Sequence, residues 1–156
     1  MAFGKDIYYL LIALVFGVAT LLLIPKSQYK KFFIYGLLFG GAFNVLIILI
    51  LSGIFKLFQY RYLGFAGIWG LFSFFTPVTW MFVFMIYLYL LPVRKIFLYP
   101  YIASFIVFGF IFGQPLEGVG MFKFYKNYQY FQPITFIIWF SAAAWAYIKG
   151  ERIALK

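Results

Sequence analysis

The chain has 156 residues, of which 67% are hydrophobic and only 10% are charged. A soluble globular domain carries about 25% charged residues and about 45–50% apolar ones, so a soluble protein of this size is excluded because it could not hide so much apolar surface. The sequence contains no cysteine and no histidine, which excludes disulfides, thiol chemistry, and zinc or haem sites built on these ligands. We therefore expect lipid to cover most of the molecule.

Five charge-free apolar stretches are long enough to be membrane spans. A helix of about 20 residues crosses the hydrocarbon core of a bilayer, which is about 30 Å thick. The pattern predicts an all-α, polytopic membrane bundle that forms a single transmembrane domain over residues 1–156. The predicted spans are Ile7–Ile24, Phe32–Phe55, Gly64–Leu91, Ile96–Phe112 and Phe131–Ile148.

The first and third spans each carry one further expectation. The apolar run Ile7–Ile24 exceeds the core of a signal peptide, which spans about 7–15 residues, and no A-x-A-like cleavage site follows it, so we interpret it as a span. Pro77 lies near the middle of the third span and predicts a kink there. Thr76 and Thr79 are placed to satisfy carbonyls that such a kink would free.

The net charge of +10 comes from 13 basic and 3 acidic residues. Because no basic run exceeds two residues, we expect these side chains to flank spans and contact lipid headgroups, with no nucleic-acid partner. Eight basic residues fall on one predicted side and five on the other, so the N-terminus is expected outside and the C-terminus in the cytoplasm of a multi-pass cell-membrane protein. The eight are Lys26, Lys30, Lys31, Arg94, Lys95, Lys149, Arg152 and Lys156.

Polar side chains within the apolar spans, or in the long outer loop at residues 113–130, are the candidate ligand contacts. A polar amide in hydrocarbon seeks a partner, either across a helix interface, where a hydrogen bond contributes about 0.6–2 kcal/mol, or on a ligand. Glu117 is one of three acids in the chain and lies in that loop. The candidates for ligand binding are Asn44, Thr76, Thr79, Trp80, Gln114 and Glu117.

Small residues spaced four apart predict close helix packing. Gly36 and Gly40 form one G-x-x-x-G pattern, and Gly109 and Gly113 form another. Such surfaces let two helix backbones approach closely, so we expect these glycines at helix interfaces within the bundle or in a homo-oligomer.

The sequence lacks most of the residue types and motifs that common catalytic mechanisms need. Nucleophilic triads need histidine or cysteine, and a paired-carboxylate mechanism needs two acids that nothing here brings together. The glycine motifs that bind nucleotides are missing, and no charged residue lies inside a predicted span. We predict a protein that is not an enzyme and has no cofactor or metal site.

Several residues support a resemblance to a known group. The segment Leu91-Pro92-Val93-Arg94-Lys95, followed by Glu117, Gly120 and Tyr125, resembles small uncharacterised multi-span proteins of spore-forming Firmicutes over roughly residues 75–145. The resemblance implies a location in a bacterial cell membrane and no particular activity. The chain is also similar in size and composition to the membrane-embedded substrate-binding subunits of vitamin transporters, which usually have six spans.

Three functions stay open at this stage. The first is a non-catalytic accessory or structural subunit that packs in a larger membrane complex or a homo-oligomer. The second is a membrane-embedded binding or carrier protein for a small apolar or amphipathic ligand, held between the second, third and fourth spans. The third is an enzyme acting on lipid with Glu117 as its only acid–base group.

Overall fold

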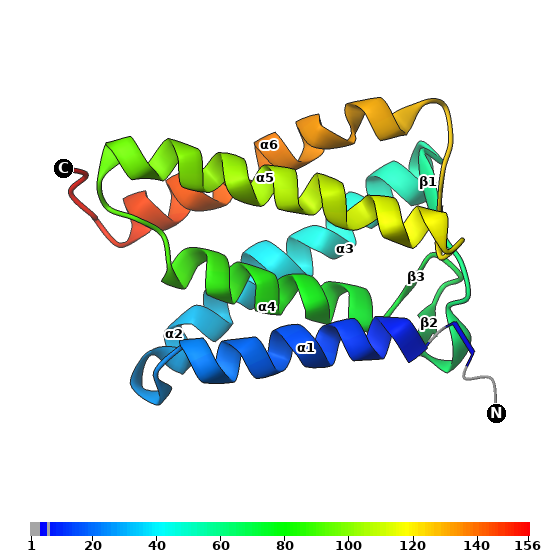
Figure 1. Ribbon diagram of the computed structural model, residues 1–156, viewed down its shortest axis with the longest axis horizontal. Coiled ribbons are helices and arrows are strands. Elements are labelled where there is room, and N and C mark those ends of the chain that lie inside the picture. Colours follow the sequence, from blue (N-terminus) through cyan, green and yellow to red (C-terminus); the bar gives the residue numbers. More distant parts are fainter. Residues whose placement is uncertain (1–3, 6) are drawn as a thin grey trace.

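A computed structural model of the chain shows a bundle of helices with a small β-structured cap at one end (Figure 1). The structure describes residues 4, 5 and 7–156. The helical elements are α1 (Ile7–Leu23), α2 (Lys26–Tyr35), η1 (Gly36–Ala42), α3 (Phe43–Ile48), η2 (Leu49–Ile54), η3 (Gly64–Ala66), α4 (Phe75–Tyr89), α5 (Lys95–Gly118) and α6 (Tyr128–Gly150).

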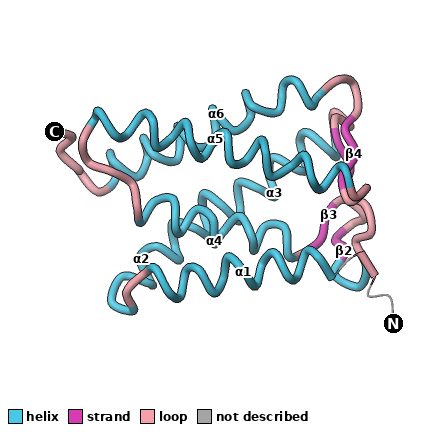
Figure 2. Tube along the Cα trace, in the orientation of Figure 1, coloured by secondary structure: helices cyan, strands magenta, loops and turns pink. Residues whose placement is uncertain are grey.

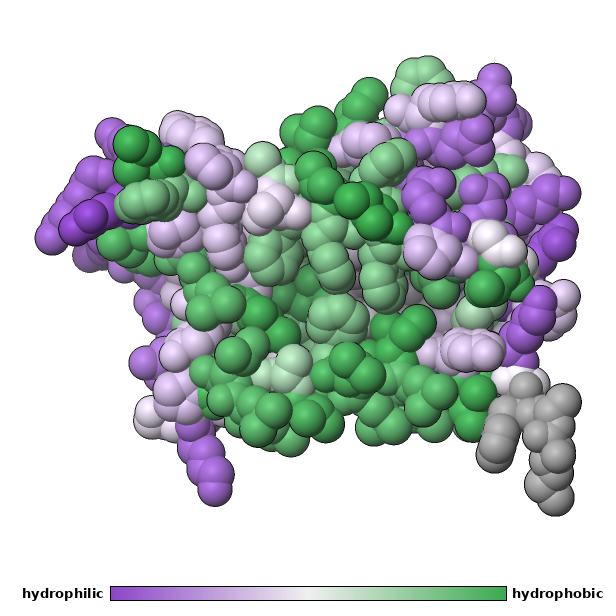
Figure 3. Space-filling view, viewed as in Figure 1, coloured by the Kyte–Doolittle hydropathy of each residue, from purple (hydrophilic) through white to green (hydrophobic). Residues whose placement is uncertain are grey.

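Three helices are long and apolar enough to cross a membrane, namely Lys26–Ile54, Lys95–Gly118 and Tyr128–Gly150. The helices α1 and α4 are also apolar but have 17 and 15 residues. At a rise of about 1.5 Å per residue they are about 25 and 22 Å long. Figure 3 shows hydrophilic residues gathered at the two ends of the bundle and a broad apolar band between them, which is the pattern of a membrane protein.

The helix Lys26–Ile54 is continuous but contains two π-helical segments, η1 and η2. Within η1, a Cβ atom on Gly40 would lie 2.3 Å from the carbonyl oxygen of Trp80. A Cβ atom on Gly36 would lie 2.6 Å from the carbonyl oxygen of Met81. Both glycines therefore face α4, and only a hydrogen at these positions permits the observed backbone separation.

Helix α4 lies at the centre of the bundle, against α1 on one side and against α2 and η1 on another, while α5 packs on α6. In the half of the bundle away from the cap, buried aromatic rings pack between α4, α5 and α6. Phe84, Tyr87 and Phe140 are fully buried, and Phe84 stacks on Phe140 with ring centroids 4.9 Å apart. The Tyr87 hydroxyl donates to the carbonyl oxygen of Phe140 at 3.0 Å, and the Tyr101 hydroxyl donates to that of Tyr87 at 2.8 Å.

The cap consists of two antiparallel strand pairs at the end of the bundle where α1 begins (Figure 2). Strand β1 (Phe58–Tyr60) pairs with β4 (Phe122–Phe124), and β2 (Gly67–Ile68) pairs with β3 (Phe72–Ser73). The Tyr9 hydroxyl lies 2.9 Å from the carbonyl oxygen of Arg61 and 2.9 Å from that of Met121. Helix α1 thereby holds both sides of the β1–β4 sheet in place.

The structure corrects the predicted third span. The predicted helix over Gly64–Leu91 begins only at Phe75, because residues 64–73 form a short 3₁₀ turn and the β2–β3 hairpin. Gly64 and Gly70 have φ of +57° and +68°, in the left-handed region that glycine adopts freely and that the interior of a right-handed α-helix does not contain.

The predicted kink at Pro77 is also wrong. Pro77 is the third residue of α4. In the first turn of a helix the backbone N–H groups have no intrahelical acceptor, so the missing N–H of a proline there breaks no helical hydrogen bond.

The end opposite the cap carries an ion pair. Lys31 of α2 and Tyr35 both donate hydrogen bonds to the carboxylate of Glu151, just beyond α6. These donors stabilise the charged form and lower the pKa of Glu151 below its usual value. The contact joins the start of the helix Lys26–Ile54 to the end of α6.

Candidate functional site

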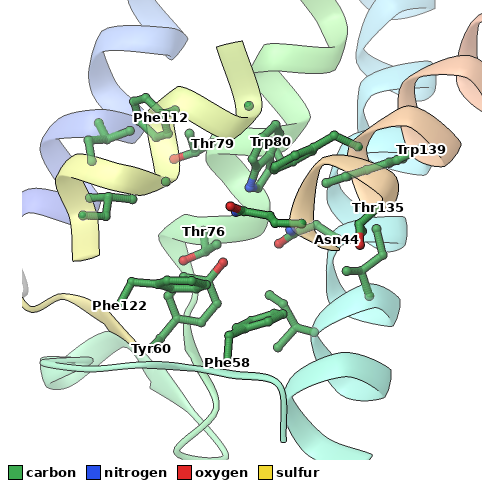
Figure 4. A pocket seen from close by; sticks show the side chains of 18 of the residues that line it. Asn44, Phe58, Tyr60, Thr76, Thr79, Trp80, Phe112, Phe122, Thr135 and Trp139 are labelled. Carbon is green, nitrogen blue, oxygen red and sulfur yellow. The ribbon is translucent and has the colours of Figure 1, made fainter. Parts of the chain in front are cut away.

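A cavity of about 90 Å³ lies between α3, α4, α5 and α6, at the end of the bundle that the cap covers (Figure 4). Most of its wall is apolar and much of it is aromatic. The aromatic residues that line it are Tyr9, Phe58, Tyr60, Trp80, Phe112, Phe122, Tyr128, Phe136 and Trp139. The strands β1 and β4 contribute Phe58, Tyr60 and Phe122, so the cap forms one wall of the cavity.

Three buried oxygens in this cavity have no hydrogen-bond partner: Asn44 Oδ1, Thr76 Oγ1 and Gln132 Oε1. Their residues are 3%, 7% and 7% exposed. No other buried side-chain nitrogen or oxygen lacks a partner within the part of the chain that the structure describes. Leaving such a group unpaired costs about 1–3 kcal/mol, so the three together are a substantial local penalty.

Two helices bring the first polar groups to the cavity. Asn44 lies one turn after Gly40 on the helix Lys26–Ile54, on the face where Gly36 and Gly40 pack against α4. Thr76 is in the first turn of α4, and one turn later Thr79 donates to the carbonyl oxygen of Phe75 at 2.8 Å. Thr79 therefore lines the cavity with its hydroxyl already paired, whereas the Thr76 hydroxyl is free.

An aromatic cluster positions Trp80 beside these groups. Its ring centroid lies 4.9 Å from that of Trp139 and 5.6 Å from that of Phe136. Figure 4 shows the indole ring above the cavity with its nitrogen directed toward the centre, where the labelled Asn44 side chain also points. The Trp139 nitrogen is directed elsewhere and donates to the carbonyl oxygen of Phe39 at 2.6 Å.

The α5–α6 interface makes room for Gln132. A Cβ atom on Gly113 would lie 3.0 Å from the amide nitrogen of Gln132, and one on Gly109 would lie 3.1 Å from the ring of Phe136. Both glycines thus face α6 and line the cavity. Since a side chain at Gly113 would push the Gln132 amide aside, the small residue there sets where this polar group lies.

The cavity is electrically neutral. No lysine, arginine, aspartate or glutamate is among its lining residues. Among the described residues no group of metal-ligating side chains is close enough together to hold an ion. The groups available are amides, hydroxyls, an indole N–H and aromatic faces, which can bind an uncharged molecule by hydrogen bonds and stacking.

Four of the six predicted ligand contacts come together in the structure: Asn44, Thr76, Thr79 and Trp80 line the cavity. Gln114 and Glu117 do not. Helix α5 continues through Pro115 to Gly118, where the sequence predicts a loop. On that helix Gly113 and Leu116 face the cavity, and their neighbours Gln114 and Glu117 are turned about 100° away.

Sequence reasoning missed several polar residues of the site. Gln132 lies inside the predicted fifth span, so the signal that identified Asn44, an amide within an apolar run, also applied to it. Thr135 and Tyr128 form a pair with oxygens 2.7 Å apart. Tyr60 comes from the cap, whose strands the sequence did not predict.

Comparison of the chain with protein-family models, with curated proteins and with solved structures finds no match. The site is therefore interpreted from its own geometry and chemistry. The resemblance to small membrane proteins of spore-forming Firmicutes stays a prediction.

Proposed function

We propose that this chain is a membrane-embedded binding protein that holds a small uncharged ligand in the cavity beneath the cap. The observation that carries this proposal is the set of three buried, unpaired oxygens on Asn44, Thr76 and Gln132, all facing one space. A ligand with hydrogen-bond donors would pair them, and the surrounding rings would cover its flat or apolar surface.

The pairing of polar groups elsewhere in the bundle supports this proposal. Buried Tyr87 and Thr20 have partners for their hydroxyls, the carbonyl oxygens of Phe140 and Gly17. Buried polar groups in proteins are nearly always paired, and unpaired ones concentrate where a ligand or water completes the network. The exceptions here are confined to one cavity.

The membrane arrangement is part of the proposal. The three long apolar helices, together with α1 and α4, would give five crossings, and the excess of basic residues at the end opposite the cap would place that end in the cytoplasm. The cap would then face outward, and the ligand would reach the cavity from the outer side of a cell membrane.

The binding proposal is tested by identifying small molecules that remain bound when the protein is extracted from its native membrane. We expect native mass spectrometry of the gently solubilised chain to show a small molecule bound to the wild type and to an S104A control, whose exposed hydroxyl is paired with the Tyr101 carbonyl outside the cavity. The double variant Asn44→Leu with Gln132→Leu is expected to lose it. A wild type without any bound molecule, or a double variant that retains it, contradicts the proposal.

The orientation is testable because the chain has no cysteine. Single-cysteine variants at Lys123, in the cap, and at Arg94, at the opposite end, give two reporters that differ only in position. In intact cells a membrane-impermeant maleimide is expected to label Lys123→Cys and to leave Arg94→Cys unlabelled until the cells are opened. The reverse pattern contradicts the orientation.

An accessory role in a larger complex or a homo-oligomer stays a prediction from the sequence. Crosslinking in native membranes followed by mass spectrometry tests it: a defined partner or a dimer band supports this role, and a monomer without partners argues against it.

A further inference from the structure

The two carboxamides of the cavity reach it from different helices. Asn44 comes from α3 and Gln132 from α6, and Thr76 of α4 lines the same cavity. Each carboxamide carries an acceptor oxygen and an NH₂ donor side by side. The natural complement of such an edge is another group with a donor beside an acceptor, because two hydrogen bonds then form at once.

Building on the proposed function, we propose that the ligand presents a small uncharged amide or urea group to Asn44, Gln132 and Thr76. The unpaired oxygens of the two amides accept hydrogen bonds and cannot donate them. A ketone, ester or ether has no donor to offer, and a hydrocarbon has neither donor nor acceptor. The ligand must therefore supply N–H or O–H groups.

Charge excludes the ionic relatives of an amide. A carboxylate would need a basic partner, and an amidinium or ammonium group would need an acidic one, but no charged side chain lines the cavity. Helix α4 begins at Phe75 beside Thr76, and the positive end of its dipole further disfavours a cation. Burying an unpaired charge in such a site is far more unfavourable than burying a neutral amide.

Shape distinguishes an amide from a polyol, which also has donors. The rings of Trp80, Trp139 and Phe136 bound the polar region with stacking faces, and a flat group fits against such faces better than a tetrahedral one. The volume of about 90 Å³ limits what is enclosed. A cavity of about 150 Å³ holds benzene, which has six heavy atoms, so this one suits a group of about four heavy atoms.

A series of near-isosteric probes tests this inference. Acetamide, acetate, acetamidinium and acetone share one shape and differ in charge and in donors. With the full chain in lipid nanodiscs, saturation-transfer NMR is expected to show acetamide binding at least about tenfold more tightly than each of the other three, since one hydrogen bond of about 1.4 kcal/mol corresponds to tenfold. Urea is expected to behave as acetamide does.

Variants assign the effect to the proposed residues. Asn44→Leu and Gln132→Met are each expected to weaken acetamide binding by about tenfold or more, and Ser104→Ala is expected to leave it unchanged. If acetone or acetate binds as tightly as acetamide, the cavity is a binding site but the amide preference is wrong. If no probe binds and nothing accompanies the purified protein, both this inference and the proposed function fail.

Discussion

The two halves of the bundle differ in whether their buried polar groups have hydrogen-bond partners. In the half away from the cap, the hydroxyls of Tyr87 and Tyr101 each donate to a backbone carbonyl oxygen, and buried aromatic rings stack between α4 and α6. In the half beneath the cap, three oxygens are unpaired around a cavity. The same two helices, α4 and α6, line both halves. The difference in hydrogen-bond pairing is therefore local to the cavity and does not reflect a general looseness of these helices.

The largest expected effect tests the close packing that supports both halves. In Gly40→Leu the new Cβ atom would lie 2.3 Å from the Trp80 carbonyl oxygen, so α4 and the helix Lys26–Ile54 must separate. We expect a loss of more than about 3 kcal/mol of unfolding free energy, or no folded protein, measured by thermal unfolding in detergent.

Its control is Gly41→Ala, at the next position along the helix. There the nearest heavy atom to the new Cβ is 3.6 Å away, which is ordinary contact, so we expect near-wild-type stability. Equal stability of the two variants would contradict the packing described for η1 against α4.

A second prediction concerns the paired half. Tyr87→Phe removes a hydroxyl that donates to the Phe140 carbonyl oxygen in a fully buried position. We expect a loss of about 1 kcal/mol in unfolding free energy. Tyr99→Phe, at a residue that is 70% exposed, is the control and should change nothing measurable.

The third prediction compares the same substitution, threonine to valine, at one buried position in each half. Thr20 is fully buried and its hydroxyl donates to the Gly17 carbonyl oxygen at 2.7 Å, whereas the Thr76 hydroxyl is buried and unpaired. We expect Thr20→Val to lower the unfolding free energy by about 0.5–1 kcal/mol, and Thr76→Val to leave it unchanged or raise it in the absence of ligand. Equal losses in the two variants would show that Thr76 has a partner in the empty protein.

The smallest expected effect concerns the ion pair at the end opposite the cap. Because the pKa of Glu151 is lowered in the folded state, its contribution is fully present above the ordinary pKa of 4.5 and is lost as the pH falls through the folded value. The pair is on the surface, so we expect less than about 1 kcal/mol. Glu151→Gln should remove this part of the acid sensitivity, and an unchanged pH profile would contradict it.

Much of the helical content follows from the sequence. A charge-free apolar run leaves the backbone no partner but itself in lipid, so helices were expected where α1, α3, α5 and α6 occur. The cap was not expected, because Phe58–Tyr60 and Phe122–Phe124 are only three residues long and their pairing joins segments far apart in the chain. Three-residue strands have too little periodicity to show in a sequence.

The site was predictable where a polar group interrupts an apolar run. That reasoning gave Asn44, Thr76 and Thr79, and it applied equally to Gln132. It failed for Gln114 and Glu117 because it carries no information on which side of a helix a residue lies. The rotation of α5 about its own axis is set by the packing of Gly109 and Gly113 on α6. This is a tertiary contact, which the local sequence of α5 does not specify.

The pairing of β1 with β4 also has a consequence for the order of assembly. Strand β1 follows the helix Lys26–Ile54, whereas β4 lies between α5 and α6. During synthesis the chain emerges from its N-terminus onward, so Phe58 and Tyr60 reach their side of the membrane well before their partners exist. The cap closes, and the cavity with Gln132 becomes complete, only when the final helical hairpin has been inserted. An intermediate that lacks this hairpin carries an unpaired aromatic strand and only part of the cavity wall.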